Sequence, residues 1–348
     1  MAELEIGIIG ATGFSGVELY RLLCSHPEKP AVTLFSSSRD GQDITEEYPH
    51  LKGISTNSTL KKLSLEHIKR MDVVFSCAPS GVSRELLPPL LEAGIRVIDL
   101  AGDYRLKDSA LYEKWYKKPA PPERWLHEAV YGLSEYNRES IKQAQLIANP
   151  GCYPTAVQLA LLPLLKNNLI DPLSLITDAK SGLSGAGASL SKSSHYANAN
   201  ESLSIYKMNA HQHIPEMEQS FAQIGKSEVI MTFSTHLVPM TRGILATMYA
   251  DLLPGVTTEI IYETLQQHYE NEHFIRVHQE NTPLSTNQVS GSNYCDISYS
   301  LDERTGRLTV YSVIDNLLKG AAGQALHNMN IMMGFNETSG LPLIPQFP

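Results

Sequence analysis

The sequence predicts an α/β protein of two domains, the first with a parallel sheet and the second, of α+β type, with a mixed and mostly antiparallel sheet. Three observations predict this fold class. Apolar strand-like runs alternate with helical runs over the first 150 residues, a glycine-rich turn follows the first strand, and β-rich runs dominate the second half. Alternating strands and helices are typical of crossover units, which make neighbouring strands parallel.

Length and charge limit the class of protein. A chain of 348 residues can form two domains with large cores. The formal net charge of -9 speaks against binding to nucleic acid or to an anionic membrane surface. No apolar run reaches the roughly 18 residues of a membrane span. Because MAELEIGIIG carries acids where a secretory signal carries basic residues, we expect a cytoplasmic protein, with a mature organellar form as the alternative.

The first domain is expected to begin with a strand in ELEIGIIG and a helix from about Phe14 to Cys24. AVTLFSSS is the second expected strand. MDVVFSCAPS, SRELLPPLLEAG and IRVIDLAGDY follow as a strand, a helix and a strand, and QLIANPGC is a further strand that ends at Cys152. This order predicts a parallel sheet.

The second domain is expected to be rich in strands. The β-rich runs are KSEVIMTFSTHLVPM, GILATMYADLL, SNYCDISYSLD and GRLTVYSVID. DERTG between the last two indicates a hairpin, and one helix is expected near Thr257 to Tyr269. A final helix in NLLKGAAGQALHNMNIMM has an apolar face at helical spacing and should pack on the first domain. That face consists of Leu318, Ala321, Ala322, Ala325, Met329 and Met332.

The turn after the first strand, GIIGATGFSG, has glycines at positions 7, 10, 13 and 16. Such a turn lets backbone amides approach a pyrophosphate at the positive end of the following helix, as in Rossmann-type domains. The spacing is GxxGxxG rather than the usual GxGxxG, and glycines also serve tight strand–helix packing. The position of the motif, between the first strand and the first helix, therefore carries the interpretation as a dinucleotide site.

The end of the second strand indicates the nucleotide. Enzymes that prefer NAD usually hold the ribose 2′-hydroxyl with an acid there. Here serines at 36–38 precede Arg39, and Asp40 comes one residue later. Hydroxyl groups and a guanidinium suit a 2′-phosphate, so NADP(H) is the predicted cofactor. A solvated loop arginine is the alternative for Arg39.

Cys152 stands in ANPGCYPTAVQLALLPLL, on a turn directly ahead of an apolar helix. Pro154 indicates that the helix starts within a residue or two of the cysteine. A thiol at a helix N-terminus has a lowered pKa, because unpaired amides and the helix dipole favour the thiolate. The preceding strand should deliver it to the carboxyl edge of the sheet, where a nicotinamide would lie. The other three cysteines are expected to be structural, without disulfides or a metal site.

A thiolate beside a nicotinamide indicates the conversion of an activated acyl group to an aldehyde through a thioester. The proton transfers of this reaction call for a histidine. His211 and His213 in NAHQHIPEMEQ are the candidates, and their spacing does not decide between them. Their H-x-H pattern has no nearby acidic or cysteine third ligand for zinc.

The motifs GATGFSG, NPGCYPTA, HQHIPE, THLVPMTRGI, GSNYCDI and DNLLKGAAGQA resemble the N-acetyl-gamma-glutamyl-phosphate reductases of arginine biosynthesis. That family is similar in architecture to the aspartate-semialdehyde dehydrogenases, which share the cysteine chemistry. The resemblance implies NADPH-dependent reduction of N-acetyl-L-glutamyl 5-phosphate to the 5-semialdehyde with release of phosphate, by a homodimer or homotetramer. We expect residues 1–150, completed by a C-terminal helical segment 316–348, to bind NADP, and 151–315 to form the catalytic and dimerisation domain.

The resemblance also implies roles for single residues. Cys152 would be the nucleophile and His213 the acid/base, with His211 as the second choice. The pyrophosphate would be held by Gly10, Thr12, Gly13, Phe14 and Ser15. The adenosine phosphate would meet Ser38 and Arg39. The cofactor would further be bordered by Ala78, Pro79 and Gly81, and its nicotinamide by Ser184, Gly185, Ala186, Gly187 and Asn316.

Three residues are candidates for binding the substrate. Arg105 in DLAGDYRL matches a position that meets the acyl phosphate in the related dehydrogenases, and a planar guanidinium suits a phosphate bidentately. Arg242 in VPMTRG is a candidate for the substrate carboxylate, with a structural ion pair as the alternative. Asn149, three residues before the cysteine, is the third.

The chain departs from the family pattern at two places. GATGFSG has Phe-Ser where Tyr-Thr is more usual, which removes one hydroxyl near the phosphates. The histidine that the aspartate enzymes carry shortly after their VP dipeptide is absent, so the base would come from HQH. Two alternatives stay open: a reductase of aspartyl phosphate or of carrier-linked aminoadipyl or glutamyl phosphate, and a regulatory NADP-binding protein without catalysis.

Overall fold

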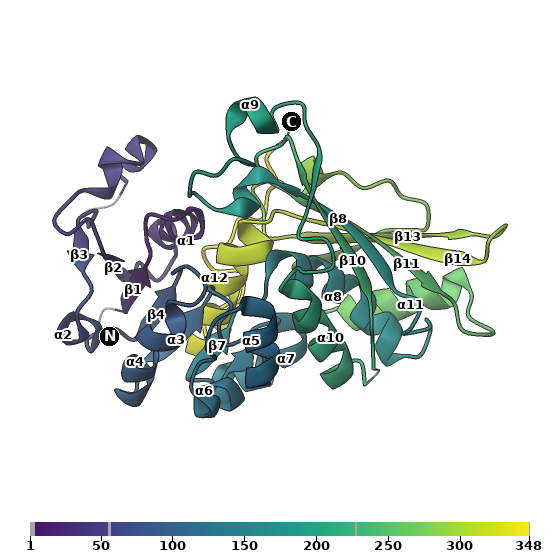
Figure 1. Ribbon diagram of the computed structural model, residues 1–348, viewed down its shortest axis with the longest axis horizontal. Helices are drawn as coiled ribbons and strands as arrows, with labels where there is room; N and C mark the ends of the chain where they lie inside the picture. Colours follow the sequence, from purple (N-terminus) through teal and green to yellow (C-terminus); the bar gives the residue numbers. More distant parts are fainter. Residues whose placement is uncertain (1–3, 55–56, 227, 348) are drawn as a thin grey trace. The chain divides into compact units, whose positions relative to one another are not determined.

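The computed structural model describes residues 4–54, 57–226 and 228–347 (Figure 1). Glu3, Ser227 and Pro348, which belong to segments interpreted above, lie outside these ranges. The chain divides into two compact units, Met1–Pro150 with Ala321–Leu341, and Gly151–Gly320 with Pro342–Pro348. Within the described ranges each unit contains one seven-stranded sheet. No helix in those ranges has the length and apolar character to cross a bilayer.

The first unit contains the predicted parallel sheet, with strand order β3-β2-β1-β4-β5-β7-β6. Every strand pair in this sheet is parallel. Its strands are β1 (Glu5–Ile9), β2 (Ala31–Ser36), β3 (Leu60–Lys62), β4 (Val73–Ser76), β5 (Arg96–Asp99), β6 (Val130–Tyr131) and β7 (Leu146–Ala148). Its helices are α1 (Phe14–Cys24), α2 (Leu65–Ile68), α3 (Ser83–Leu86), α4 (Pro88–Glu92), α5 (Ser109–Tyr116), α6 (Glu123–Glu128), α7 (Ser134–Gln143) and α12 (Gly323–Met333).

The central strands of the first sheet, β1, β2 and β4, are buried because they are mostly apolar. Ile6, Ile8, Phe35 and Phe75 are fully buried at its centre. A parallel sheet covered on both faces needs apolar residues at every position, and each such side chain contributes about 1.5–3 kcal/mol through burial. The chain order reverses at β1, so the crevice between the ends of β1 and β4 is the position at which sheets of this type bind nucleotides.

Some elements of the first unit differ from the prediction. SRELLPPLLEAG forms two short helices, α3 and α4, instead of one, because Pro88 and Pro89 have no N–H to continue the first helix. The helix α7 was not predicted. Its sequence SEYNRESIKQ buries only Ser134 and Ile141, so it carries almost no apolar periodicity.

The second unit contains the predicted mixed sheet, with strand order β12-β13-β14-β11-β8-β10-β9. The pairs β12–β13 and β8–β10 are parallel and the other four are antiparallel. Its strands are β8 (Ile176–Gly182), β9 (Ser204–Tyr206), β10 (Thr232–Val238), β11 (Ile244–Asp251), β12 (Ile275–Val277), β13 (Cys295–Asp302) and β14 (Arg307–Ile314). Its helices are α8 (Cys152–Lys166), α9 (Tyr196–Ala199), α10 (His213–Gln223) and α11 (Thr258–Tyr269).

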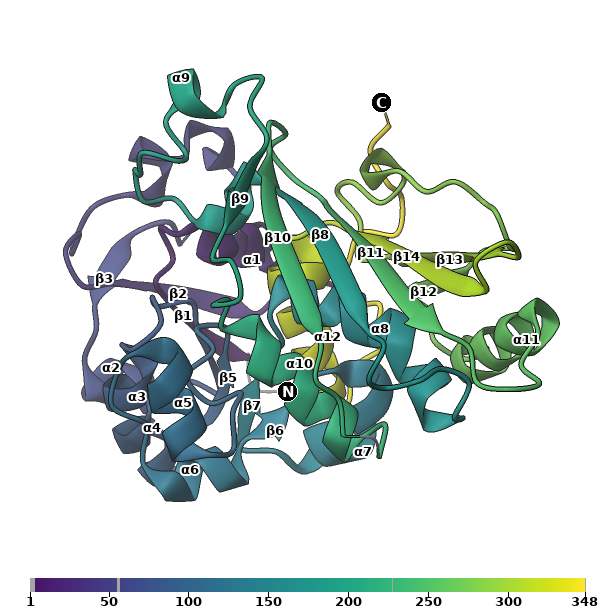
Figure 2. The same cartoon turned by 45° about the vertical axis from the view of Figure 1, so that its right-hand side comes forward.

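Local predictions for the second unit are confirmed. DERTG joins β13 to β14 in a hairpin in which Asp302 pairs with Arg307. The helix α11 follows Thr257, whose side chain accepts a hydrogen bond from the Ile260 N–H and so caps it. Both ribbon views show α8, α10 and α11 on one side of this sheet (Figure 1, Figure 2). The burial pattern of β10 alternates accordingly, with Phe233 buried and His236 less so.

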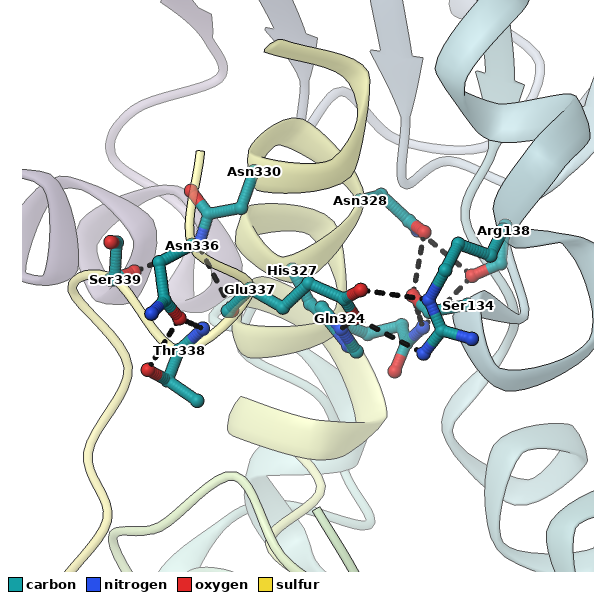
Figure 3. Close-up of polar contacts among 11 residues, drawn as sticks. Ser134, Arg138, Gln324, His327, Asn328, Asn330, Asn336, Glu337, Thr338 and Ser339 are labelled. Carbon is teal, nitrogen blue, oxygen red and sulfur yellow. Dashed lines mark hydrogen bonds and ion pairs between the residues drawn. The ribbon is translucent and has the colours of Figure 1, made fainter. Parts of the chain in front are cut away.

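The C-terminal helix begins with a π-helical turn, Leu318–Ala322, and continues as α12. The predicted apolar face is buried, apart from a partly exposed Ala321. The polar residues of this helix are buried as well: Gln324, His327, Asn328 and Asn330. They bond to other parts of the first unit, as the hydrogen bonds from Gln324 to Ser134 and from Asn330 to the Ser339 carbonyl show (Figure 3). Hydrogen bonds within the first unit therefore allow polar side chains of α12 to be buried beside its apolar face.

Candidate active site

The glycine-rich turn between β1 and α1 is built for close approach of the backbone. Gly10 has a φ of +76°, and a Cβ there would lie 2.7 Å from the carbonyl oxygen of Cys77. The Gly13 N–H donates to the Gly10 carbonyl at 3.1 Å, and no described side chain caps α1. The first amides of this 11-residue helix can therefore bind an anion. Of the five residues expected at the pyrophosphate, Gly10, Thr12 and Gly13 lie in the turn, and Phe14 and Ser15 begin α1. Their contact with the pyrophosphate remains a prediction.

Arg39 and Asp40, which follow β2, both make polar contacts with other parts of the first unit. The Arg39 guanidinium forms an ion pair with Glu47, and both side chains are partly exposed. The Asp40 carboxylate accepts a 2.8 Å hydrogen bond from the Lys62 N–H at the edge strand β3. Asp40 is thus engaged with the protein backbone. Glu47, which the sequence did not single out, is the acid that would compete with a 2′-phosphate for Arg39.

The loop after β4, with Ala78, Pro79 and Gly81, is backed by two buried aspartates, Asp99 and Asp103. Burial raises the pKa of Asp99 to about 6, and the charge of Asp103 adds to this effect. Asp99 accepts a 2.7 Å hydrogen bond from the Ser83 hydroxyl at the far end of the loop. Cys77 as a residue is partly exposed. Burial nevertheless raises the pKa of its thiol to about 12, and the charge of Asp99 adds to this rise. This thiol is unsuited to act as a nucleophile.

Arg105 lies in the turn after β5 and is buried. Its Nε donates to the Asn149 carbonyl at 2.7 Å, and its Nη2 donates to the Leu100 carbonyl at 3.0 Å. Backbone carbonyls therefore orient the guanidinium. These bonds agree with a fixed phosphate-binding fork, and the binding itself remains a prediction.

Asn149 is held by the protein at both ends of its side-chain amide. Its Oδ1 accepts from Asn328 Nδ2 at 3.0 Å, and its Nδ2 donates to the Ala321 carbonyl at 3.2 Å. Asn328 is itself fixed by the Ser134 hydroxyl (Figure 3). Because of these bonds, Asn149 connects the C-terminal helix to the backbone that orients Arg105. Its predicted contact with substrate is untested.

Cys152 is the first residue of α8, a 15-residue helix whose N-cap is Gly151. The predicted helix start is confirmed. The cysteine is partly exposed, while the helix behind it is almost completely buried. The chain returns against it at Gly320, where a Cβ would lie 2.8 Å from the Cβ of Cys152. The absence of a side chain at position 320 therefore leaves room at the thiol.

The two candidate histidines have different surroundings. His213 begins α10, and its ring lies against Gly151, where a Cβ would overlap Nε2. His211 Nδ1 accepts a 3.1 Å hydrogen bond from the His213 N–H. The ring of His211 is surrounded edge-on by Tyr153, Tyr206 and Phe233. His213 is therefore next to the residue that precedes the cysteine, whereas His211 packs in an aromatic cluster behind it.

Glu216 and two tyrosines belong to this site although the sequence did not assign them to it. Glu216 is fully buried, and its Oε1 accepts a 2.8 Å hydrogen bond from the Gly151 N–H. It lies three residues after His213 on α10, a spacing that places the two side chains next to each other on the helix. The Tyr206 hydroxyl donates to the Tyr153 hydroxyl at 3.1 Å. Burial raises the pKa of both tyrosines, and the nearby Cys152 adds to this rise, so both hydroxyls stay protonated.

The segment expected at the nicotinamide follows β8. Asn316 accepts a 2.7 Å hydrogen bond from the Gly243 N–H and donates to the Ser184 hydroxyl at 2.9 Å. The structure thus brings Asn316 and the turn 184–187 together within the second unit. Arg242 lies 3.6 Å from the buried carboxylate of Asp315. The ion pair that was the alternative for Arg242 is present, and a role toward substrate remains a prediction.

Two matches to protein families cover most of the chain. Residues 5–144 match the semialdehyde dehydrogenase NAD-binding domain, and residues 152–316 match the semialdehyde dehydrogenase dimerisation domain. Among curated proteins, the N-acetyl-gamma-glutamyl-phosphate reductase of Geobacillus kaustophilus is 50% identical over 99% of this chain and 100% of its own length. That of Bacillus subtilis is 49% identical with the same coverage.

Solved structures with the same fold are more distant in sequence. Aspartate semialdehyde dehydrogenase II of Vibrio cholerae aligns with a TM-score of 0.72 at 16% identity, over 96% of this chain and 99% of that one. The aspartate semialdehyde dehydrogenase of Candida albicans, solved with NADP, aligns with a TM-score of 0.67 at 18% identity over 95% and 99%. These likenesses show a shared fold. The identity of about half the residues over full length shows more, and this chain belongs to the N-acetyl-gamma-glutamyl-phosphate reductases of the semialdehyde dehydrogenase family.

Proposed function

We propose that this protein reduces N-acetyl-L-glutamyl 5-phosphate to N-acetyl-L-glutamate 5-semialdehyde and phosphate with NADPH, as a step of arginine biosynthesis. One observation carries the proposal. Cys152 is the first residue of α8, and the ring of His213 lies against the residue before it. A nucleophile at a helix N-terminus with an adjacent imidazole is the arrangement that acyl transfer through a thioester requires. Membership in the reductase family supports the same substrate.

The covalent steps use Cys152 and His213. The Cys152 sulfur, favoured as a thiolate by the helix N-terminus, attacks the acyl carbon, and the carbon–oxygen bond to phosphate breaks. Bound NADPH supplies the hydride that reduces the resulting thioester. His213 donates a proton to the oxygen as the thiohemiacetal forms, and removes it again when the carbon–sulfur bond breaks and the aldehyde leaves. The thiolate is thereby regenerated.

The neighbouring groups position these two residues and the substrate. Glu216 accepts a hydrogen bond from the Gly151 N–H, so it connects the turn before Cys152 to α10, the helix that carries His213. We assign the acyl phosphate to Arg105, whose guanidinium is oriented by two backbone carbonyls. The substrate carboxylate is assigned to Arg242, in competition with its ion pair to Asp315.

We assign the first unit, 1–150 with the C-terminal helix, to NADP(H) binding. The glycine turn and the uncapped N-terminus of α1 fit a pyrophosphate. Ser38 and Arg39 at the end of β2 suit the 2′-phosphate, and Asp40 bonds to the backbone of β3. The match of residues 5–144 to an NAD-binding domain supports a nicotinamide cofactor, which can be NAD(H) or NADP(H).

We further propose a homodimer or homotetramer in the cytoplasm. The match of residues 152–316 to a dimerisation domain supports self-association through the second unit. The helices α8, α10 and α11 lie on one side of its sheet, so the other side is a candidate for the contact (Figure 2). Light scattering coupled to size exclusion would give the mass of the assembly, and a monomer at micromolar concentration would contradict it.

The experiment that tests the activity is the reverse reaction. The enzyme would be incubated with NADP⁺, phosphate and one of three aldehydes: N-acetylglutamate semialdehyde, aspartate semialdehyde or a carrier-linked aminoadipate semialdehyde. We expect phosphate-dependent NADPH formation with the first alone. Turnover confined to another aldehyde would assign a different acyl-phosphate reductase. Tight NADPH binding without turnover of any of them would leave a nucleotide-binding protein.

A further inference from the structure

The loop that follows β4 is held almost entirely by charged side chains. Its backbone turns at Gly81, where φ is +88°. The Gly81 N–H donates to both oxygens of Asp103, at 2.7 and 2.8 Å. The Gly81 carbonyl accepts from Arg84 Nε at 3.0 Å, and the Ser80 carbonyl accepts from the ammonium of Lys118. The Gly81 N–H, the Gly81 carbonyl and the Ser80 carbonyl, at the tip of this loop, are thus each bound by a charged side chain.

Asp103 is the centre of this arrangement and is fully buried. Besides the Gly81 amide, its carboxylate accepts from the Ser80 hydroxyl at 3.1 Å and the Arg84 N–H at 3.2 Å. A fourth donor is the Tyr112 hydroxyl at 2.9 Å, which comes from α5 and lies outside the loop. A buried carboxylate is tolerated when several donors satisfy it. Two of these four donors belong to the loop, and a third, the Arg84 N–H, belongs to α3 directly after it.

Two exposed residues of the same loop are apolar. Pro79 and Val82 are exposed, and Val82 keeps 45% of its surface in contact with solvent. A loop that is fixed by charge on its buried side and presents apolar groups on its outer side resembles a preorganised wall of a ligand site. Its place at the carboxyl end of β4 puts it on one side of the strand-order reversal, while Arg39 at the end of β2 lies on the other.

We propose that Asp103 is a positioning residue for the cofactor, whose carboxylate holds the loop 77–83 in the conformation that receives the nicotinamide half of NADP(H). The inference rests on the proposed function, because it requires that the first unit binds this dinucleotide. Arg105, assigned above to the acyl phosphate, lies two residues further along the same turn. Asp103 therefore links the geometry of the cofactor loop to that of the substrate arginine through one short segment.

The test compares two nucleotides on two variants. Asp103→Asn keeps the shape of the side chain but removes its charge and replaces one acceptor by a donor that faces backbone N–H groups. We expect the Kd for NADPH to rise about tenfold, the effect of losing one hydrogen bond to a charged group. The nucleotide 2′,5′-ADP lacks the nicotinamide half and should contact only the part of the site near the end of β2. Its Kd should therefore stay within about twofold of the wild-type value. Both constants would be measured by calorimetry on the full-length protein.

Tyr112→Phe is the matched control, because it removes the donor to Asp103 that comes from α5 and leaves the bonds from the loop and from Arg84 in place. We expect both Kd values to be unchanged in this variant. If Asp103→Asn does not fold, Lys118→Met replaces it, since this exposed side chain holds the Ser80 carbonyl from the other side. It should weaken NADPH about threefold and leave 2′,5′-ADP unchanged.

The outcomes separate the inference from the function on which it rests. Equal losses of both nucleotides, or no loss of NADPH, would overturn the role of Asp103. A wild-type protein that fails to bind NADPH would overturn the proposed function before any variant is compared. In steady state, the selective effect should raise the KM for NADPH more than it lowers kcat, a split that general destabilisation does not produce.

Discussion

The backbone N–H of Gly151 donates a 2.8 Å hydrogen bond to the fully buried carboxylate of Glu216. Gly151 is the N-cap of the helix that begins with Cys152, and Glu216 lies one turn after His213 on α10. The single bond therefore fixes the nucleophile's turn to the element that carries the proposed base, across 65 residues of sequence. Catalysis by paired groups depends on such fixed geometry, because small displacements of the reacting atoms slow the reaction strongly.

Removing this acceptor should reduce turnover. We expect Glu216→Ala to lower kcat by about 10- to 100-fold, while the KM for NADPH stays near the wild-type value. Glu216→Gln retains an oxygen that can accept from Gly151 and should recover most of the loss. Gln223→Ala, an exposed position on the same helix, is the control and should be silent. Equal kcat in wild type and Glu216→Ala would show that the bond is dispensable.

Cys152→Ser should abolish acyl transfer without affecting nucleotide binding. A serine hydroxyl is not ionised at neutral pH, so we expect kcat to fall at least about 10³-fold while the Kd for NADPH is unchanged. Cys24→Ser, at the last residue of α1, is the control. A thiol-reactive probe at neutral pH should label Cys152 before Cys77, whose thiol stays protonated. Retained turnover in Cys152→Ser would remove the cysteine from the mechanism.

The two histidines should respond differently to substitution. His213→Asn removes the ring next to Gly151 and is expected to lower kcat by about 10²- to 10⁴-fold and to flatten its pH profile. His211→Asn alters the aromatic cluster behind it and should have a smaller effect with the wild-type profile shape. The measurement is kcat between pH 5.5 and 9. A larger loss for His211→Asn would exchange the two assignments.

The ion pair between Arg39 and Glu47 makes a prediction about nucleotide preference. Arg39→Ala should raise the KM for NADPH by about tenfold or more and change that for NADH little, because a charge-assisted contact to the 2′-phosphate is lost. Glu47→Gln should have the opposite sign and lower the KM for NADPH, since a competing carboxylate is neutralised. Equal effects of Arg39→Ala on both nucleotides would end the assignment of NADP.

Glu337 makes a prediction about stability at acid pH. Its carboxylate bonds to Arg138 Nε at 2.7 Å and to His327 Nε2 at 2.6 Å (Figure 3). Burial alone raises the pKa of Glu337, but the bonds from His327 and Arg138 outweigh it and lower the pKa to about 2, from the usual 4.5. Between these values the unfolded chain binds the proton that the folded one does not. The stabilisation is therefore complete above pH 4.5 and is lost as the pH falls toward 2.

Urea unfolding at several pH values measures this effect. From pH 5 to pH 2.5, wild type should lose about 1–2 kcal/mol more unfolding free energy than Glu337→Gln, a value reduced for the partial exposure of the pair. Glu139→Gln, which removes an exposed acid paired with Lys142, is the control and should follow wild type. Parallel curves for wild type and Glu337→Gln would show that this carboxylate does not contribute.

The sequence alone predicted the features that depend on neighbouring residues. The helices from Phe14 and from Thr258, the hairpin at DERTG and the start of a helix at Cys152 are all present. Each is encoded by a short pattern: apolar periodicity, a capping residue, a turn or a proline in the first helical turn. The family was identified in the same way, because its motifs are short and contiguous.

The tertiary structure alone decided which distant groups meet. Nothing near Glu216 in the sequence indicates that its carboxylate binds Gly151, and nothing near Asp103 indicates that it holds Gly81. The apolar face of α12 was predicted, but nothing in the sequence indicates that Asn328 is buried and bonds to Asn149. Local patterns report which face of an element is apolar, whereas a buried polar group is satisfied by partners that only the folded chain brings into contact.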